Sequence, residues 1–333
     1  MLRGILAALF ASFVGFPGLA RAAEDGIAGA AEKFGAKSGV GGNSERLAGH
    51  IDSWIALGLV LLSLLVAWSL NHERAATRKA GTVLSGFGCL GVTIWFVAIN
   101  SSGLVSDPKP AIIALDNAKP FLLWFQAVIS AVAGIVLVGR GLRMAGRDER
   151  LRLDWINETE RYGRLSRYLH WTTAILFLAL IPMGIFTSMI PEGIWFRQGY
   201  YVVHKTIGLL VLGLLVVRIV WNSRSPRPPL DPKLKPWEGK LAHAMHRLLY
   251  LLMLAFPLTG FVMSTYGGKL SHFFIWDTPL WWGKDMGAVI PWALAHKIVL
   301  PYLAYLVIGA HVLGVVKHHF VDKKPEALRR MAG

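Results

Sequence analysis

Long apolar segments constrain this chain more than any other feature of its sequence. A helix of about 20 apolar residues spans the hydrocarbon core of a bilayer. The mean hydropathy is +0.48, and only 17% of the residues are charged. The sequence therefore predicts an all-α integral membrane protein with about seven transmembrane helices, at residues 51–71, 80–101, 120–139, 167–188, 200–221, 241–264 and 292–316.

The connections between these segments alternate in charge. Arginine and lysine gather in every second connection and in the C-terminal tail, whereas the other connections hold only one or two each. Cytoplasmic loops carry the excess of basic residues in membrane proteins. The pattern predicts a periplasmic N-terminus and a cytoplasmic C-terminus in the plasma (inner) membrane of a bacterium. It also accounts for the net charge of +15 without nucleic acid as a partner.

The chain divides into five expected parts. Arg3, a short apolar core and Ala20-x-Ala22 have the form of a signal peptide. We therefore expect a signal peptide at 1–22, a periplasmic segment at 23–50, a three-span membrane extension at 51–139, a basic cytoplasmic connection at 140–166 and a four-span domain at 167–333.

Histidines are concentrated in the last four spans. His170 and His311 lie near the predicted inner ends of two spans, and His204 and His296 lie near the outer ends of two spans. His296 and His311 are fifteen residues apart in one helix, which separates them by roughly 22 Å and about 60° of rotation. Neutral imidazole is an axial ligand of haem iron. The spacing favours two b haems, each held by two helices.

Other readings of these histidines remain open. Each one alone is also typical of an interfacial polar residue, and zinc is a weaker alternative because two ligands do not close a tetrahedral site. The single cysteine, Cys89, excludes a thiolate cluster.

Several polar residues near the span ends are secondary candidates. Basic side chains at the interface suit the haem propionates, and we assign this role to Arg167, Lys205 and Lys297. Imidazoles at the inner surface suit proton exchange with a quinone, for which the candidates are His246, His318 and His319. The alternative is a plain interfacial position for His246 and a solvated basic tail for His318 and His319.

The second half of the chain carries recognisable stretches. RYGRLSRYLHWTTA, HKTIGLLVLGLLVVRIVW, AHAMHRLLYLLMLAFPLTGFVMS and GAHVLGVVKHHFV make the region from about 161 to 333 resemble the bacterial cytochrome b561 family. This family is related to the cytochrome b subunits of hydrogenases and formate dehydrogenases. The resemblance implies a four-helix bundle with two b haems on His170, His204, His296 and His311. It also implies electron exchange with a quinone and, in some members, superoxide oxidation at the outer side.

This chain departs from the family pattern in two ways. The signal peptide and the three-span extension precede the family region, and the spacing between His296 and His311, with Pro301 between them, is one residue longer than usual. In the extension, Gly86, Gly88 and Gly91 favour close helix packing, and Gln126 and Ser130 favour hydrogen bonds between helices.

The leading functional prediction is a di-haem cytochrome that transfers electrons between a periplasmic donor, such as superoxide, and the quinone pool, with membrane lipid around it. One alternative is the membrane anchor of a larger oxidoreductase with a dehydrogenase subunit. Another is a transporter or scaffold without redox chemistry, although the spans carry no Asp or Glu at mid-depth, where cation-coupled transporters place them. Whether the protein is an enzyme by itself stays open at this point.

Overall fold

The computed structural model describes residues 42–101, 119–144, 153–159, 161–189, 197–230, 234–274, 276–324 and 330–331. The expected signal peptide at 1–22 and most of the expected periplasmic segment at 23–50 lie outside the described residues. Part of the connection at 140–166 also lies outside them.

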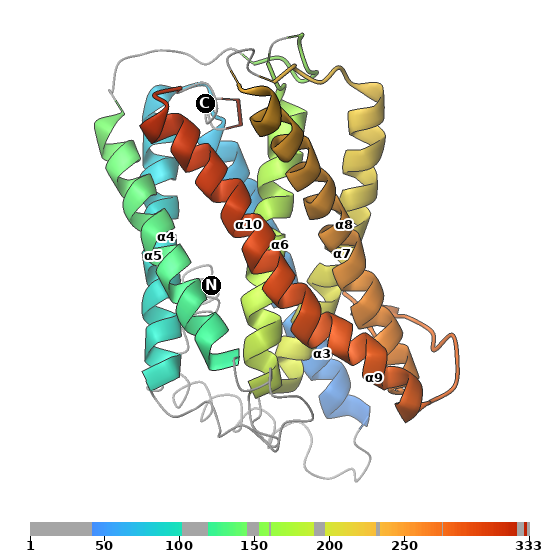
Figure 1. Cartoon of the computed structure of the whole chain (residues 1–333). Coiled ribbons are helices and arrows are strands. Elements are labelled where there is room, and N and C mark those ends of the chain that lie inside the picture. The colour runs from blue at the N-terminus through green and yellow to red at the C-terminus, as the bar shows by residue number, and fades with distance from the viewer. Residues whose placement is uncertain are drawn as a thin grey trace.

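Helices occupy all seven predicted spans (Figure 1). They are α3 (Gly42–Leu70), α4 (Ala75–Ser101), α5 (Lys119–Arg143), α6 (Arg164–Met189), α7 (Arg197–Arg224), α8 (Pro236–Tyr266) and a composite last helix. The last helix runs through α9 (Met286–Leu294), the π-helical turn η2 (Ala295–Val299), α10 (Leu300–Val316) and the π-helical turn η3 (Lys317–Val321). A short antiparallel hairpin pairs β1 (His272–Phe273) with β2 (Trp276–Asp277).

Six of these helices are long and apolar enough to cross a membrane, as judged over the described residues. In α3 the described apolar part is shorter, Trp54–Leu70, although the helix begins earlier than the sequence predicts, at Gly42. The prediction of an all-α integral membrane protein is confirmed.

The helices run up and down between two ends of the molecule (Figure 1). We call the end with the β1–β2 hairpin and the start of α9 the hairpin end. The opposite end, with the first residues of α6 and α8 and the last residues of α7 and η3, is the basic end. Both names are used below without reference to a compartment.

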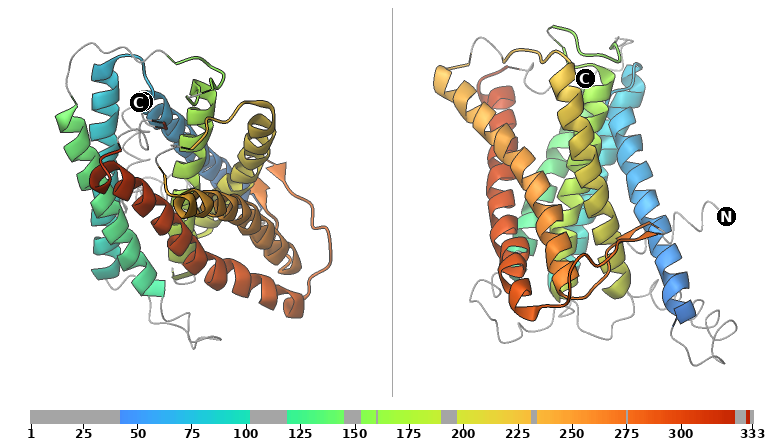
Figure 2. Two further views of the ribbon diagram at one scale, coloured as in Figure 1. Left: turned by 45° about the horizontal axis from the view of Figure 1, so that its top comes forward. Right: turned by 90° about the vertical axis from the view of Figure 1, so that its right-hand side faces the viewer.

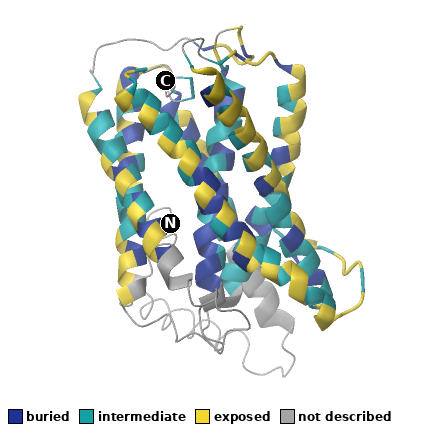
Figure 3. Cartoon of the chain, in the orientation of Figure 1, coloured by how far each residue is buried: buried dark blue, intermediate teal, exposed yellow. Residues whose placement is uncertain are grey.

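Exposed residues lie along the helices (Figure 3), and many of them are large and apolar. Leu61, Leu84 and Ile135 are each more than half exposed, as are Leu251 and Leu306. Contiguous apolar surface of this extent is costly in water but not beside lipid tails. The surface therefore agrees with the membrane assignment.

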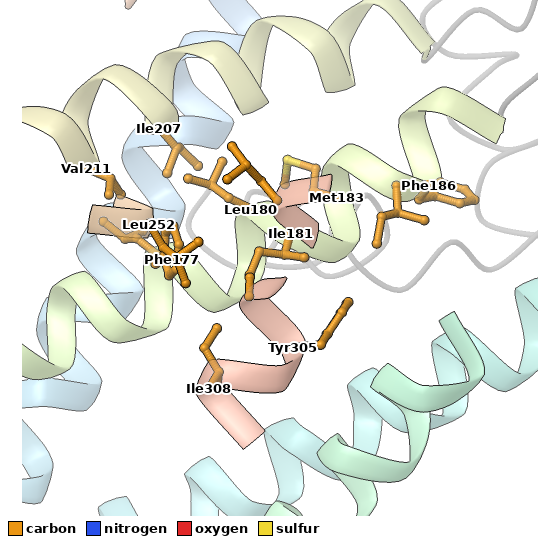
Figure 4. Packing of buried hydrophobic residues seen from close by; sticks show 14 of the residues in the cluster. Phe177, Leu180, Ile181, Met183, Phe186, Ile207, Val211, Leu252, Tyr305 and Ile308 are labelled. Carbon is orange, nitrogen blue, oxygen red and sulfur yellow. The ribbon is translucent and has the colours of Figure 1, made fainter. Parts of the chain in front are cut away.

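The last four helices pack in sequence around a common core. α7 lies between α6 and α8, and α8 contacts both α9 and α10. Their buried side chains are mostly branched aliphatic and aromatic, and Figure 4 shows them extending from α6, α7, α8 and α10 toward one another. The members include Phe177, Leu180, Ile181, Ile207, Val211, Leu252 and Ile308.

The first three helices are packed onto this bundle rather than set apart from it. α3 lies against α6 and α7, while α4 and α5 form a close pair (Figure 2). The pair reaches the bundle through two edge-to-face aromatic contacts, Trp95 with Phe186 of α6 and Phe125 with Tyr305 of α10. The extension therefore contacts α6 and α10, two of the helices that carry candidate ligands.

Small residues allow the close approach of α4 and α5. A Cβ atom on Gly86 would lie 2.8 Å from the backbone nitrogen of Val138 and 2.9 Å from the carbonyl oxygen of Gly134. The Ser130 hydroxyl lies 2.9 Å from that of Thr93 across the same interface. The predicted roles of Gly86 and Ser130 are confirmed. Those of Gly88 and Gly91 are wrong, because no described atom lies within 4 Å of a Cβ at either glycine.

The substitution Gly86→Ala tests this interface. The added methyl group would meet backbone atoms that have no room to move, and overpacking of this kind costs about 1–3 kcal/mol. We expect a lower Tm in detergent with unchanged haem content. Gly88→Ala is the matched control and leaves Tm unchanged or slightly raised, since alanine favours helix over glycine. Equal Tm values for both variants would contradict the packing.

Candidate functional site

Two of the predicted ligands meet at the hairpin end of the bundle. His204 on α7 and His296 in η2 have ring centroids 6.1 Å apart, with ring planes at 87°. A metal–imidazole bond is about 2 Å long and the ring centre lies about 1 Å beyond the nitrogen, so two axial imidazoles on one metal have centres about 6 Å apart. The separation of these two rings therefore suits a shared axial metal.

A hydrogen bond sets the orientation of His296. The Thr259 hydroxyl on α8 donates to the carbonyl oxygen of Ala255 at 2.7 Å, so its oxygen is the acceptor for His296 Nδ1–H at 3.1 Å. A proton on Nδ1 leaves the Nε2 lone pair free for a metal. Partners of this kind commonly orient metal-binding histidines.

Packing sets the orientation of His204. Its Nδ1 atom is buried and has no hydrogen-bond partner among the described residues. The ring instead packs against α6 with its Cε1 edge, which would lie 2.8 Å from a Cβ atom on Gly184.

Gly260 on α8 plays the same part for His296. A Cβ atom at this position would lie 2.7 Å from His296 Cε1. His204 and His296 therefore each depend on a neighbouring glycine, which leaves room for the ring next to the helix backbone. Sequence reasoning missed both glycines, although Gly260 and Gly184 each lie in an apolar span three and two residues after a proline, respectively.

The π-helical turn η2 resolves the unusual spacing between His296 and His311. In this turn the backbone N–H of Leu300 bonds to the carbonyl of Ala295, five residues back. Pro301, which has no N–H to continue the α-helical pattern, follows directly. A π turn accommodates about one extra residue and so removes about 100° of rotation. The angle between His296 and His311 around the helix axis then becomes about 40°, compared with about 60° in a regular α-helix.

Three histidines gather toward the basic end. The rings of His246 on α8 and His311 on α10 have centroids 5.4 Å apart. His170 on α6 lies within electrostatic range of both, and of Arg218 on α7. Sequence analysis placed His170 and His311 at this level but assigned His246 to a quinone or proton site. The structure brings it beside the proposed ligands.

The environment of the four predicted ligands fits a prosthetic group. Protein atoms surround the rings of His170, His204, His296 and His311. All four residues are nevertheless only partly buried. Partly accessible histidines within a helical bundle are compatible with a flat group beside each ring. Two helices contribute a ring at each level, as axial ligation from both faces requires.

The structure changes the ranking of the arginines near the basic end. Arg167 is buried, and it donates to the carbonyl of Tyr162 at 3.0 Å and to Oδ1 of Asn71, directly after α3, at 3.4 Å. These contacts tie α6 to the extension. Arg218, by contrast, lies over the ring of Tyr250 and within electrostatic range of His170 and His311. It is therefore the better-placed cation for an anionic group beside these histidines.

Three lysines lie together at the hairpin end. Lys205 Nζ donates to the carbonyl of Leu270 at 2.7 Å and lies in electrostatic range of Lys269. The side chain of Lys284 lies beside Gly268. This lysine cluster (Lys205, Lys269 and Lys284) makes the surface next to His204 positive. Lys297, the third predicted propionate contact, directly follows His296 within η2.

A charged network lies at the basic end, where α8 begins and η3 ends. Lys317 Nζ donates to Glu238 and to Asp322, each at 2.8 Å, and His318 Nδ1 lies 2.7 Å from Asp322 Oδ2. The ring of the neighbouring His319 packs edge-on against Phe320. Glu238, His318 and Asp322 are close enough to share a metal ion. Lys317 already supplies the positive charge between the two carboxylates, so we assign no metal here.

Comparison with known proteins identifies the second half of the chain. Residues 161–333 match the family model of the prokaryotic cytochrome b561. The chain belongs to the prokaryotic cytochrome b561 family. The match contains α6 to η3 and therefore all four predicted ligands and both glycines. The extension, α3 to α5, precedes it.

Relatives of this cytochrome b561 support the assignment. Cytochrome b561 homolog 2 of Escherichia coli (strain K12) is 34% identical over 184 residues, which cover 54% of this chain and 96% of the relative. Cytochrome b561 homolog 1 of the same organism is 29% identical over 187 residues, or 51% and 97% of the two chains. The probable superoxide oxidase CybB of Yersinia pestis is 27% identical over 174 residues, or 52% and 96%.

Membership of this family implies haem b binding in a multi-pass membrane protein. The transporter or scaffold reading without redox chemistry therefore loses its support. The resemblance found in the sequence is confirmed.

The substitution Gly260→Ala tests the cradle of His296. The new methyl group displaces the ring, so we expect the haem b signal in the reduced-minus-oxidised spectrum to be weakened or perturbed. Gly213→Ala is the matched control, because no described atom lies within 4 Å of a Cβ on that glycine. A normal spectrum in folded Gly260→Ala protein would show that His296 is not held as described.

Proposed function

We propose that this cytochrome b561 is a di-haem protein that carries electrons through the membrane from a donor at the hairpin end to a quinone at the basic end. His204 and His296 hold one haem b, and His170 and His311 hold the other. The observation that carries this proposal is the 6.1 Å separation of the His204 and His296 ring centroids, since no ordinary packing requirement brings two imidazoles together inside a bundle.

Charge supports the orientation. The basic end holds Arg164, Arg224 and Lys240, whereas the hairpin end holds few cations besides the lysine cluster. Under the positive-inside rule the basic end faces the cytoplasm and the hairpin end faces the periplasm. Electrons would then pass inward, over the roughly 22 Å of helix that separates His296 from His311.

Haem b, when bound, supplies one-electron iron chemistry. The residues of this chain orient it and keep water out. Thr259 and Gly260 hold His296, Gly184 admits His204, and the aliphatic core around Val211 and Leu252 separates the two levels. Arg218 is placed to offset anionic propionates at the basic end.

An anionic donor fits the hairpin end. The lysine cluster lies beside His204 and raises the local concentration of small anions. One relative is named a probable superoxide oxidase, and superoxide is such an anion. Two superoxide ions would give up one electron each and leave as oxygen, while one quinone would take both electrons and two protons to become quinol. His318 and His319 at the basic end are the candidate proton donors.

Single histidine substitutions test the ligand pairing. His311→Ala and His170→Ala remove the ligands of one haem, so each should halve the haem-to-protein ratio and spare the signal of the hairpin-end haem. His204→Ala should do the converse. The measurements are haem extraction and a redox titration followed by absorbance.

His246→Ala is the control that distinguishes the two possible partners of His311. If His170 is the ligand, His246→Ala retains both haems. Loss of the basic-end haem in His246→Ala but not in His170→Ala would overturn the pairing. A wild-type protein without b-type absorbance would end the di-haem proposal.

Ionic strength and charge removal test the anionic donor. We expect the double substitution Lys269→Gln, Lys284→Gln to slow haem reduction by superoxide by a factor of about three to ten at low salt and to weaken its salt dependence. Lys240→Gln removes an exposed cation at the opposite end and should leave the rate unchanged. The same salt dependence in the double variant and wild type would argue against steering.

A further inference from the structure

We propose that Asp322 is a positioning residue that holds His318 as the proton donor to quinone at the basic end. This inference rests on the proposed function, because it assumes that quinone is reduced there. It goes beyond that function by assigning the proton to one of two adjacent histidines and by naming the group that controls it. The atom that His318 would protonate is a quinone oxygen, which gains negative charge on reduction.

The contact between the two side chains defines which nitrogen acts. His318 Nδ1 lies 2.7 Å from Asp322 Oδ2. A carboxylate only accepts hydrogen bonds, so Nδ1 carries a proton and Nε2 is the nitrogen that exchanges one with a substrate. The two side chains are 20% and 23% exposed. They are shielded enough to hold their geometry and open enough to be reprotonated from the aqueous phase.

The backbone around His318 and Asp322 adopts two uncommon conformations, a π turn and a residue with positive φ. The last helix ends in the π turn η3, in which the N–H of Asp322 bonds to the carbonyl of Lys317 at 3.0 Å. Lys323 then adopts a φ of 53°, and the N–H of Lys324 bonds back to the carbonyl of His318 at 2.8 Å. π turns and left-handed residues other than glycine are uncommon and concentrate at functional sites. Here they return the Asp322 carboxylate to His318.

The neighbouring charges keep Asp322 ionised. Glu238 on α8, Lys317 in η3 and Asp322 directly after η3 are charged groups that lie close to His318. The hydrogen bond from Lys317, followed by that from His318, holds the pKa of Asp322 below its usual range. Asp322 is therefore a carboxylate throughout the pH range in which imidazole titrates, and it acts as an acceptor rather than as the donor.

Reduction of a quinone to quinol takes two electrons, which bound haem would supply one at a time, and two protons from the cytoplasmic side. The His318 imidazolium gives its Nε2 proton to a quinone oxygen, becomes neutral imidazole, and regains a proton from water before the second transfer. The adjacent carboxylate keeps the proton on Nδ1 and so leaves Nε2 as the nitrogen that faces the quinone in both steps.

The substitution Asp322→Ala tests the assignment. Alanine removes the acceptor that holds His318 Nδ1–H, whereas Asp322→Asn keeps an acceptor at this position. We expect the haem content and reduced spectrum to be unchanged in both variants. In single-turnover oxidation of the pre-reduced protein by a short-chain ubiquinone analogue, Asp322→Ala and His318→Gln should lower the rate by roughly tenfold or more. Asp322→Asn should restore most of the rate.

Glu238→Gln is the matched control. It breaks the other ion pair of Lys317 but leaves the contact between His318 and Asp322 in place. If Asp322 only anchors the helix end, Asp322→Ala and Glu238→Gln should behave alike, and that result would overturn the proposal. An unchanged rate in Asp322→Ala would overturn it as well. If the wild-type haems are not oxidised by quinone at all, the proposed function fails instead.

Discussion

The absence of water from the bilayer core is the constraint on which this structure depends. Each backbone N–H and C=O must find its partner within a helix, since no solvent is available to replace a lost bond. The chain therefore has few ways to position a side chain at depth. It can choose a residue's height along a helix, admit a ring with a glycine, or change the helical rotation with a π turn. The hairpin-end histidines use all three.

The sequence predicted those properties that depend on one helix at a time. Apolar length placed the seven helices, and the fixed rise per residue placed His170 and His311 at one level and His204 and His296 at the other. The helix bounds extend a few residues beyond the apolar spans, because Arg164, Arg224 and Pro236 continue the helices into the interface. The stretches that resemble the cytochrome b561 family added the prediction that both levels bind haem.

Features that depend on the rotation and contacts of several helices were not predictable. Gly88 lies in the same glycine-rich stretch as Gly86, yet only Gly86 faces α5. Arg167 and Arg218 both lie at the predicted inner ends of spans. Arg167, however, contacts Asn71 of the extension, whereas Arg218 lies near the histidines. His246 was placed at the correct depth, although its approach to His311 depends on how α8 and α10 cross. A single sequence does not specify how each helix is rotated or at what angle two helices cross.

The π turn η2 also bears on how proteins of this kind change in evolution. An extra residue in an ordinary membrane helix would rotate every later side chain by about 100° and move the ligands off their common face. Confined to one wide turn before Pro301, the extra residue leaves both ends of the helix in phase. The number of residues between His296 and His311 can then differ by one without changing how the two side chains are related in space.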